Sequence, residues 1–348
     1  MARTILWASL ALAPIAIAAR FVLDLDDTLL FALAAAALVP LAWLIGESTE
    51  HAAEHTGPGV GGFLNASFGN APELIIAVFA IANGLPNVVR GSLAGSVVSN
   101  ILLVLGVALI AGGEGKLDRR SLTIQLGIVL AACAAFLVPS VPGWSGNPDR
   151  HSLAVLTIPV AVCLLLLYVG VTGMNLRRHR QTHRDTPTGA ERGGWSLPTS
   201  LAVLLLATGA TALISEMLVH SLDAFAESAG LSEFFIAAVI VAIVGNAAEH
   251  GGAVVIARRG KMVLATEIAI SSSAQVAVFV APAIALLAWI VKPALPLAFR
   301  PIELGAMAAS AVFVAFVIRD GRSKRWEGFM LVGVYGAVVL AFLLSGDR

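Results

Sequence analysis

The chain has 348 residues, of which 58% are hydrophobic and only 13% are charged, and its formal net charge is zero. A soluble domain carries about 25% charged residues, so this composition excludes an ordinary polar surface around most of the chain. The zero net charge also argues against nucleic acid or acidic macromolecules as partners. We therefore expect an all-α integral membrane protein with the lipid bilayer as its main surroundings.

Apolar segments of membrane-spanning length recur along the whole chain, since a spanning helix needs about 20 mainly apolar residues. Eleven segments fit, near 4–22, 28–50, 62–83, 86–111, 121–140, 152–175, 198–219, 232–257, 262–290, 301–318 and 328–345. The first segment follows Arg3 and ends near small residues, so a cleaved signal peptide is the alternative reading. We expect it to be retained, because the pattern below needs it as a span.

Lysine and arginine gather in alternate connections between these segments. With the N-terminus inside, 16 of the 22 basic residues fall on the cytoplasmic side. This bias satisfies the positive-inside rule and predicts a multi-pass protein of the cell inner membrane with a cytoplasmic N-terminus. The one long polar connection, 177–197, is also basic and is expected to be a cytoplasmic linker.

Two motifs on either side of that linker match at a constant offset. Gly69-Asn70-Ala71-Pro72-Glu73 corresponds to Gly245-Asn246-Ala247-Ala248-Glu249, 176 residues later, and the same offset pairs Gly84 with Gly260 and Ser96 with Ser272. Five helices separate the copies, so the second copy crosses the membrane in the opposite sense. Inverted repeats with interrupted polar helices are typical of secondary transporters, whose sites lie at the repeat interface.

This repeat divides the chain into four parts. Residues 1–24 are an extra N-terminal transmembrane helix, 25–176 form a first inverted repeat of helices 2–6, 177–197 are the linker, and 198–348 form a second repeat of helices 7–11.

The glutamates of the two motifs are the strongest candidate site residues. Glu73 and Glu249 lie inside apolar spans, where a carboxylate is costly and is usually functional. Asn70 and Asn246 stand three residues earlier on the same helical faces. Two carboxylates and two amide oxygens form a hard-oxygen set that suits Ca²⁺, so Glu73 and Glu249 are the expected metal ligands. The alternative, a structural ion pair, lacks a basic residue at comparable depth.

The neighbouring helices offer further oxygen ligands. Ser96 and Ser99 lie on helix 4, with Asn100 alongside, while Ser272 and Gln275 lie on helix 9. Small polar residues also let transmembrane helices pack closely, so the serines have a purely structural alternative. Without metal, desolvation and mutual repulsion favour protonation of two buried carboxylates, whereas a divalent cation favours their ionised form. Competition of this kind at a site opened alternately to each side is antiport.

Acidic stripes mark both ends of a possible cation route. Helix 2 ends with Glu47, Glu50 and Glu54 near the cytoplasm, and helix 7 carries Glu216, His220, Asp223 and Glu227 toward the outside. We interpret them as two cation vestibules, with solvated helix ends as the alternative. The segment His51-Ala52-Ala53-Glu54-His55 also fits a zinc-peptidase pattern. Its place at a membrane boundary makes an enzyme the minor hypothesis.

At these residues the sequence resembles the Ca²⁺/H⁺ antiporters, the cation/proton exchangers of the Ca²⁺/cation antiporter superfamily. The resemblance runs from about Leu41 to Pro282 and is carried by GGFLNASFGNAPELIIAVFAIANG, VVRGSLAGSVVSNILLVLG, IVGNAAEHGGAVVIARRGK and AISSSAQVAVFVAP. It implies that Glu73 and Glu249 bind the ion and protons with support from Asn70 and Asn246. It also implies gating roles for Glu50 and Glu216, and His250 resembles the proton-exchanging branch rather than the Na⁺-driven one.

The sequence departs from the family pattern in a basic rather than acidic linker and in Pro72, which is expected to kink helix 3. The expected function is exchange of cytoplasmic Ca²⁺ for external H⁺, with no cofactor beyond the transported ions, and assembly as a homo-oligomer is left open. The alternatives are a Na⁺-driven or Mn²⁺/Na⁺-selective exchanger, a passive cation channel and, least favoured, a metallopeptidase.

Overall fold

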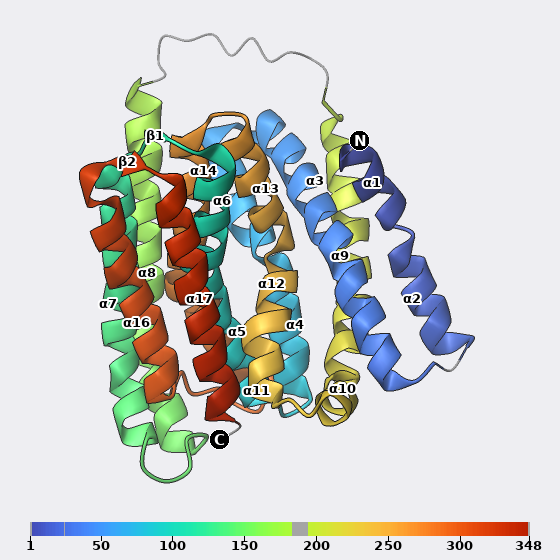
Figure 1. The fold of residues 1–348 in the computed structure, drawn as a ribbon. Helices are drawn as coiled ribbons and strands as arrows, with labels where there is room; N and C mark the ends of the chain where they lie inside the picture. Colours follow the sequence, from blue (N-terminus) through green and yellow to red (C-terminus); the bar gives the residue numbers. More distant parts are fainter. Residues whose placement is uncertain (1, 24, 183–193, 347–348) are drawn as a thin grey trace.

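The computed structural model describes residues 2–23, 25–182 and 194–346, which form a bundle of long helices (Figure 1). In this described part the strands are β1 (Gly115–Lys116) and β2 (Arg322–Ser323), which pair antiparallel at one end of the bundle. The chain begins at the end that carries this sheet, and α17 finishes at the opposite end (Figure 1). The predicted all-α membrane class is confirmed.

The long polar connection divides the helices into two groups along the chain. Those before the long polar connection are α1 (Ala2–Ser9), α2 (Leu12–Phe21), α3 (Asp27–Gly69), α4 (Ala71–Ala82), α5 (Pro86–Val98), the π-helix η1 (Ser99–Val104), α6 (Leu105–Gly112), α7 (Arg119–Gly143) and α8 (His151–Thr182). Those after it are α9 (Leu197–His220), α10 (Leu222–Ala229), α11 (Glu233–Ile236), the π-helix η2 (Ala237–Val241), α12 (Ala242–Gly245), α13 (Ala247–Arg258), α14 (Met262–Gln275), the π-helix η3 (Val276–Val280), α15 (Ala281–Val291), α16 (Pro301–Val317), the 3₁₀-helix η4 (Ile318–Asp320) and α17 (Arg325–Ser345).

The number of membrane spans differs from the sequence expectation. Nine helical stretches of the described chain are long and apolar enough to cross a bilayer, or ten if the bent pair 222–229 and 233–245 is one span. The count of eleven is therefore not confirmed. The predicted span 62–83 does not form one helix, because its first part ends α3 and its second part is the twelve-residue α4. The expected linker 177–197 differs from the structure at its start, because α8 continues to Thr182, and residues 183–193 lie outside the described part of the chain.

Two helix breaks fall at the same place in the repeated motifs. Asn70 separates α3 from α4 with φ −100° and ψ 14°, and Asn246 separates α12 from α13 with φ −94° and ψ 11°. The next connections both contain a glycine with positive φ, Gly84 at 73° and Gly260 at 77°. Pro72 follows its break and occupies the first turn of α4, where proline is tolerated. The equivalent break at Asn246 occurs without a proline, so a break of this kind at Asn70 does not require Pro72.

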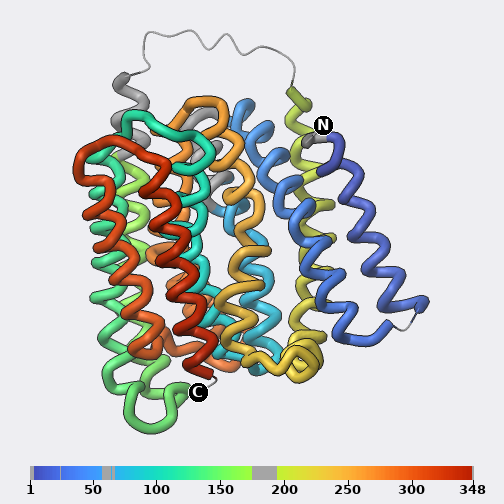
Figure 2. The backbone as a smooth tube through the Cα atoms, in the orientation of Figure 1, coloured from blue at the N-terminus to red at the C-terminus, as the bar shows by residue number. Residues whose placement is uncertain are grey.

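The bundle has three parts, whose arrangement can be followed in Figure 2. Helices α1, α2, α3 and α9 form one side, and α7, α8, α16 and α17 form the other. The broken helices lie between them. Figure 1 shows that α4 and α13 run in opposite directions, with the following turns at opposite ends of the bundle. The two repeated motifs therefore meet in the interior rather than at a surface.

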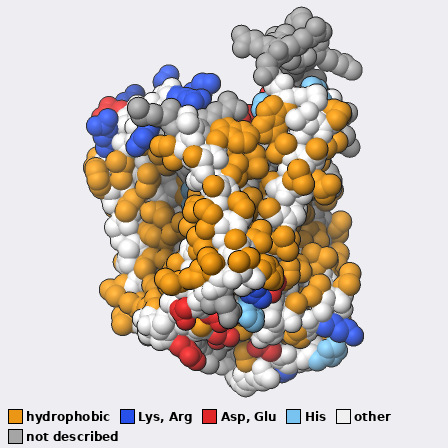
Figure 3. All heavy atoms as spheres, turned by 90° about the vertical axis from the view of Figure 1, so that its right-hand side faces the viewer, with side chains coloured by type: hydrophobic (Ala, Val, Ile, Leu, Met, Phe, Trp, Pro, Cys, Tyr) orange, Lys and Arg blue, Asp and Glu red, His pale blue; other side chains and the backbone are white. Residues whose placement is uncertain are grey.

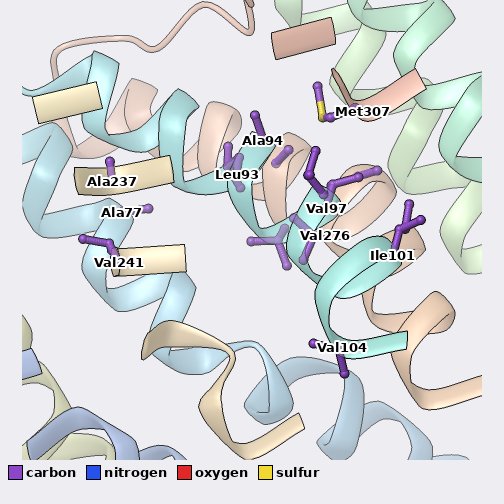
Figure 4. Close-up of a cluster of buried hydrophobic side chains, with 14 of the residues drawn as sticks. Ala77, Leu93, Ala94, Val97, Ile101, Val104, Ala237, Val241, Val276 and Met307 are labelled. Carbon is purple, nitrogen blue, oxygen red and sulfur yellow. The ribbon is translucent and has the colours of Figure 1, made fainter. Parts of the chain in front are cut away.

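The interior around the broken helices is packed by small and branched side chains. Figure 4 shows Leu93, Ala94 and Val97 of α5 in the same cluster of buried side chains as Ala237 and Val241 of η2. Gly91 and Gly95 make this close approach possible, because a Cβ on Gly95 would overlap the backbone of Ala238. Small residues at such crossings are the usual way for transmembrane helices to pack tightly.

The outer surface is apolar in the middle and charged at the ends. Figure 3 views the side formed by α1, α2, α3 and α9 and shows a broad band of hydrophobic side chains, with charged groups above and below it. Exposed side chains in this band include Ile15, Leu205 and Leu206, which are 52%, 74% and 72% exposed. Lipid is the medium in which such exposure is favourable.

Polar caps set the starts of several long helices at the ends of the band. The side chains of Asp26, Asp118 and Ser196 accept hydrogen bonds from backbone amides of α3, α7 and α9. Each cap satisfies an amide that would otherwise lack a partner in the first helical turn.

Candidate cation-binding site

The two motif glutamates occupy the first turns of the short helices that follow the breaks. Glu73 is the third residue of α4 and Glu249 is the third residue of α13. The amides of a first helical turn carry partial positive charge, which favours an anionic group there. Glu73 is only 5% exposed, and Glu249 is somewhat more accessible. The breaks thus bring a carboxylate and a helix N-terminus together at the centre of each motif.

Each glutamate packs against the glycine of the other motif. A Cβ placed on Gly245 would lie 3.3 Å from Cγ and 3.7 Å from Oε1 of Glu73. In the reciprocal contact, a Cβ placed on Gly69 would lie 3.7 Å from Oε1 of Glu249. Both carboxylates therefore reach across to the opposite break, and the two motifs form one site.

A network of neutral side chains connects the second motif to the neighbouring helices. Nδ2 of Asn246 donates to Oγ of Ser96 at 2.8 Å. Nδ2 of Asn100 donates to Oγ of Ser272 at 2.9 Å and to Oδ1 of Asn246 at 3.4 Å. The Ser272 hydroxyl donates in turn to Oε2 of Glu249. Of the residues expected from sequence, Ser272 therefore contacts Glu249 directly, while Asn246 and Ser96 are linked to Ser272 through Asn100.

The first motif has a different set of partners. Nδ2 of Asn70 donates to Oε1 of Gln275 at 3.1 Å, so these two predicted site residues are brought together. Oε2 of Glu73 is buried with no hydrogen-bond partner in the described chain. The hydroxyl of Ser99 is buried but bonds the carbonyl of Ser96 in its own helix at 3.2 Å. Ser99 therefore lies near the site without pointing its hydroxyl into the network.

The charge balance of the site is negative and uncompensated. Among the described residues, no ion pair involves Glu73 or Glu249. The adjacent imidazole of His250 bonds Oδ1 of Asn100 through Nε2 at 2.8 Å. Carboxylate, amide and hydroxyl oxygens are the ligands that Ca²⁺ prefers. Two facing carboxylates without a basic partner are expected to accept either a divalent cation or protons.

Sequence reasoning placed Asn100 beside the candidate serines but did not count it among the principal site residues. It is fully buried and contacts Asn246, Ser272 and His250. The repeat comparison hides it, because the offset of 176 pairs Asn100 with Val276. The available signal was its polarity within the apolar run SNILLV, which forms η1.

The acidic stripe of α3 lies near the end of its apolar stretch Asp27–Thr56 and forms a local cluster. His51 lies 3.7 Å from Glu47 and 3.5 Å from Glu54, measured between imidazole nitrogen and carboxylate oxygen. Glu50 is exposed on a different side of the helix from its buried neighbours Ser48 and Thr49. His51 thus joins two carboxylates of the stripe, on the part of α3 that precedes the break at Asn70.

The zinc-peptidase pattern in this stretch does not converge on one point. His51 faces the two glutamates, whereas Nε2 of His55 lies 2.8 Å from the carbonyl oxygen of Trp195. In the described chain, no group of three histidine, cysteine, aspartate or glutamate side chains is placed to hold a metal ion. The geometry gives no support to the metallopeptidase hypothesis.

Glu216, which was assigned to the vestibule on the outer side, contacts the extra N-terminal helix. Nη2 of Arg20, in the last turn of α2, lies 3.4 Å from Oε1 of Glu216 on α9. Both side chains are partly exposed, at 23% and 39%. Sequence reasoning gave α2 no part near the vestibules, and only the packing of α2 beside α9 reveals this contact.

Comparison with known families and relatives gives a consistent result. The family described as "Sodium/calcium exchanger protein" matches residues 27–177 and 199–344. The Ca(2+)/H(+) antiporter ChaA of Bacillus subtilis (strain 168) is 37% identical over 328 residues, covering 91% of this chain and 93% of the relative. The Ca(2+)/H(+) antiporter of Aphanothece halophytica is 34% identical over 363 residues, covering 97% and 96%.

Solved structures match over nearly the same range. The structure of native YfkE aligns with a TM-score of 0.83 and 34% identity, covering 98% of this chain and 99% of that chain. The crystal structure of the H+/Ca2+ exchanger CAX aligns with a TM-score of 0.73 and 18% identity, covering 98% and 92%. The second match concerns the fold alone.

Proposed function

The chain belongs to the sodium/calcium exchanger protein family, and we propose that it is a secondary active transporter that exchanges Ca²⁺ for H⁺ across a membrane. Relatives named as Ca(2+)/H(+) antiporters align with more than 90% of its length, which supports this assignment. The observation that carries the proposal is the reciprocal packing of Glu73 and Glu249 over the two helix breaks.

In this mechanism Ca²⁺ and protons compete for the same two carboxylates. Ca²⁺ bound between Glu73 and Glu249 keeps both ionised, with amide or hydroxyl oxygens of Asn70, Asn246, Ser96 or Gln275 completing its coordination. When the cation leaves, two carboxylates facing each other in a dry interior take up protons. Because the two carboxylates cannot hold Ca²⁺ and protons at the same time, the transport of Ca²⁺ in one direction is coupled to the transport of protons in the opposite direction.

The repeat supplies the alternating access. We assign residues 25–176 and 198–348 to the two inverted halves and residues 1–24 to a helix outside them. The matched breaks at Asn70 and Asn246 and the opposite directions of α4 and α13 support this division (Figure 1). A site at the interface of two such halves opens to one side or the other as the halves rock.

The routes to the site follow the acidic stripes. Glu47 and Glu50 are assigned to the route from the basic face, which we take as cytoplasmic, and Glu216 to the route from the opposite face. We assign to His250 a role in sensing the state of the site, which its hydrogen bond to Asn100 and the bond of Asn100 to Ser272 support. We assign the protein to the inner membrane of a cell, with its N-terminus on the cytoplasmic side.

A Na⁺-driven exchanger is the second candidate, because the matching family is described by both sodium and calcium. The site distinguishes the two. His250 beside Glu249 and its bond to Asn100 add a titratable group that a Na⁺ site does not need. Proton coupling is therefore the favoured drive.

The test is Ca²⁺ uptake by the purified protein in proteoliposomes that are acidic inside. We expect uptake that a protonophore abolishes and that a Na⁺ gradient does not replace. Uptake driven only by Na⁺ would identify the second candidate, and uptake indifferent to both gradients would identify a passive channel. The Glu249→Gln variant should lose uptake, with Glu114→Gln in the exposed loop after α6 as the matched control.

A further inference from the structure

A polar crevice runs between α7, α8 and α14, away from the acidic stripe of α3. Its volume is about 440 Å³. The mouth is lined by the exposed residues Asp118 and Arg120 at the start of α7, on the basic face of the bundle. The inner end is lined by Gln275, which is the hydrogen-bond partner of Asn70. The lining of the crevice therefore includes residues of the basic face as well as a residue that contacts the ion site.

The polar lining follows a regular pattern on three helices. Each helix contributes two polar side chains four residues apart, which places them on one face. These pairs are Ser121 and Gln125 on α7, Tyr168 and Thr172 on α8, and Ser271 and Gln275 on α14. Polar side chains in a spanning segment are costly in lipid and normally face protein or water. Three polar pairs around one crevice favour water as its content.

The lining also contains an oxygen that water would satisfy. Nε2 of Gln125 donates to Oγ of Ser121 at 3.2 Å. Oε1 of Gln125 is buried and has no hydrogen-bond partner in the described chain. Buried amide oxygens normally have a protein or water partner. At about 30 Å³ per molecule, the crevice has room for roughly a dozen waters.

The charges in the crevice favour protons over a divalent cation. Asp118 is the one carboxylate in its lining, and it lies at the mouth together with Arg120. Beyond the mouth the polar groups are neutral hydroxyls and amides. Ca²⁺ needs several oxygen ligands that include carboxylates, and it is poorly stabilised between neutral walls in a membrane interior. A proton passes along hydrogen-bonded water without carrying a hydration shell.

We propose that the crevice between α7, α8 and α14 is a water-filled branch through which protons from the basic face reach Gln275, Asn70 and Glu73, while the cation uses the route along α3. The assignment of protons as its cargo rests on the proposed exchange function. The proposal that the crevice is filled with water does not rest on that function, because water in the crevice can be measured whether or not the protein transports protons.

Hydration is tested by thiol accessibility in lipid nanodiscs. Cys133 and Cys163 are replaced by alanine, and single cysteines are introduced by Gln125→Cys and Ser271→Cys. Thr123→Cys is the matched control, because Thr123 is exposed on α7 and does not line the crevice. A membrane-impermeant cationic methanethiosulfonate should label both crevice thiols at least tenfold faster than the control, since a thiol reacts as its thiolate and the thiolate needs water. Equal rates at all three positions, or no labelling of the crevice thiols, would overturn the proposal.

The proton branch is tested by Gln125→Leu, with Thr123→Val as the control on the lipid side of the same helix. At saturating Ca²⁺ the maximal exchange rate of Gln125→Leu should fall about fivefold or more, because a polar group on the water path is lost. The KM for Ca²⁺ should stay within about twofold of the starting protein. Thr172→Val gives a second position and should act in the same direction.

An unchanged maximal rate in both crevice variants, or a rise in KM without a fall in rate, would refute the proton role. If the starting protein shows no proton-coupled exchange while the crevice thiols label rapidly, the proposed function fails and the water-filled crevice stands. If exchange is proton-coupled and the thiols do not label, the crevice proposal fails and the function stands.

Discussion

The contact between Glu73 and Gly245 predicts an asymmetric response to the smallest possible substitution. In Gly245→Ala the new methyl would lie 3.3 Å from Cγ and 3.6 Å from Cδ of Glu73. Comfortable carbon separations are about 3.5–4.0 Å, so the carboxylate must retreat by a few tenths of an ångström. In Gly69→Ala the methyl would lie 3.7 Å from Oε1 of Glu249, which is ordinary contact. The first variant should therefore disturb the site more than the second.

The size of the effect follows from the cost of overpacking. A methyl forced into a packed site costs about 1–3 kcal/mol. Because the glutamate side chain can rotate away from the methyl, we expect a cost of about 1 kcal/mol. A loss of about 1 kcal/mol in Ca²⁺ binding corresponds to a roughly fivefold rise in KM. Folding should change little, because both glycines have helical backbone angles without a positive φ, which alanine also adopts. Both glycines end a helix just before its break.

The assay is the KM for Ca²⁺ in proteoliposomes for the two variants and the starting protein, with thermal stability measured in parallel. Gly245→Ala should raise KM about fivefold at unchanged stability, and Gly69→Ala should raise it less than twofold. An equal or larger effect of Gly69→Ala would refute the reasoning, since the structure gives that methyl more room.

Three further predictions follow from other contacts. Gly95→Ala should prevent stable folding, because its methyl would overlap the backbone of Ala238. Gly127→Ala is the control, because no atom lies within 4 Å of its new methyl, and it should leave the melting temperature in detergent unchanged or raised. Arg20→Gln should change the free energy of unfolding by less than about 1 kcal/mol, because the pair with Glu216 is partly exposed. At low ionic strength it should raise the apparent affinity for external Ca²⁺ about twofold, and Arg20→Lys should not. Asn100→Leu should destabilise the protein by about 1–3 kcal/mol, because it leaves buried polar partners unsatisfied, and unchanged melting together with unchanged transport would contradict its place in the network.

The membrane fold could be predicted because the bilayer permits few solutions. Long apolar segments must form helices in lipid, so the positions of α7, α9 and α17 followed from length and composition. The helix breaks at Asn70 and Asn246 could not be located in this way, since the flanking residues remain apolar and helical in character. Where a proline gave a local signal, at Pro72, the break lies two residues earlier and recurs in the other motif without proline.

The candidate site was predictable in its residues and less so in its connections. The constant offset of 176 picked out Glu73 and Glu249 because symmetry-related residues are repeated in the sequence. Asn100 was underestimated because it has no polar counterpart in the other half. The contact of Arg20 with Glu216 joins residues 196 positions apart. Tertiary packing alone decides such a pairing, and no periodicity in the sequence reports it.

The central claim is that Ca²⁺ and protons compete for Glu73 and Glu249, and proton release on Ca²⁺ binding tests it most directly. Ca²⁺ is added to purified protein in weakly buffered detergent solution, and released protons are counted with a pH indicator. The starting protein and Glu114→Gln should release protons on binding, Glu73→Gln and Glu249→Gln should each release fewer, and the double variant should release none. Undiminished proton release from the double variant would contradict the account, because the protons displaced by Ca²⁺ would then come from other groups.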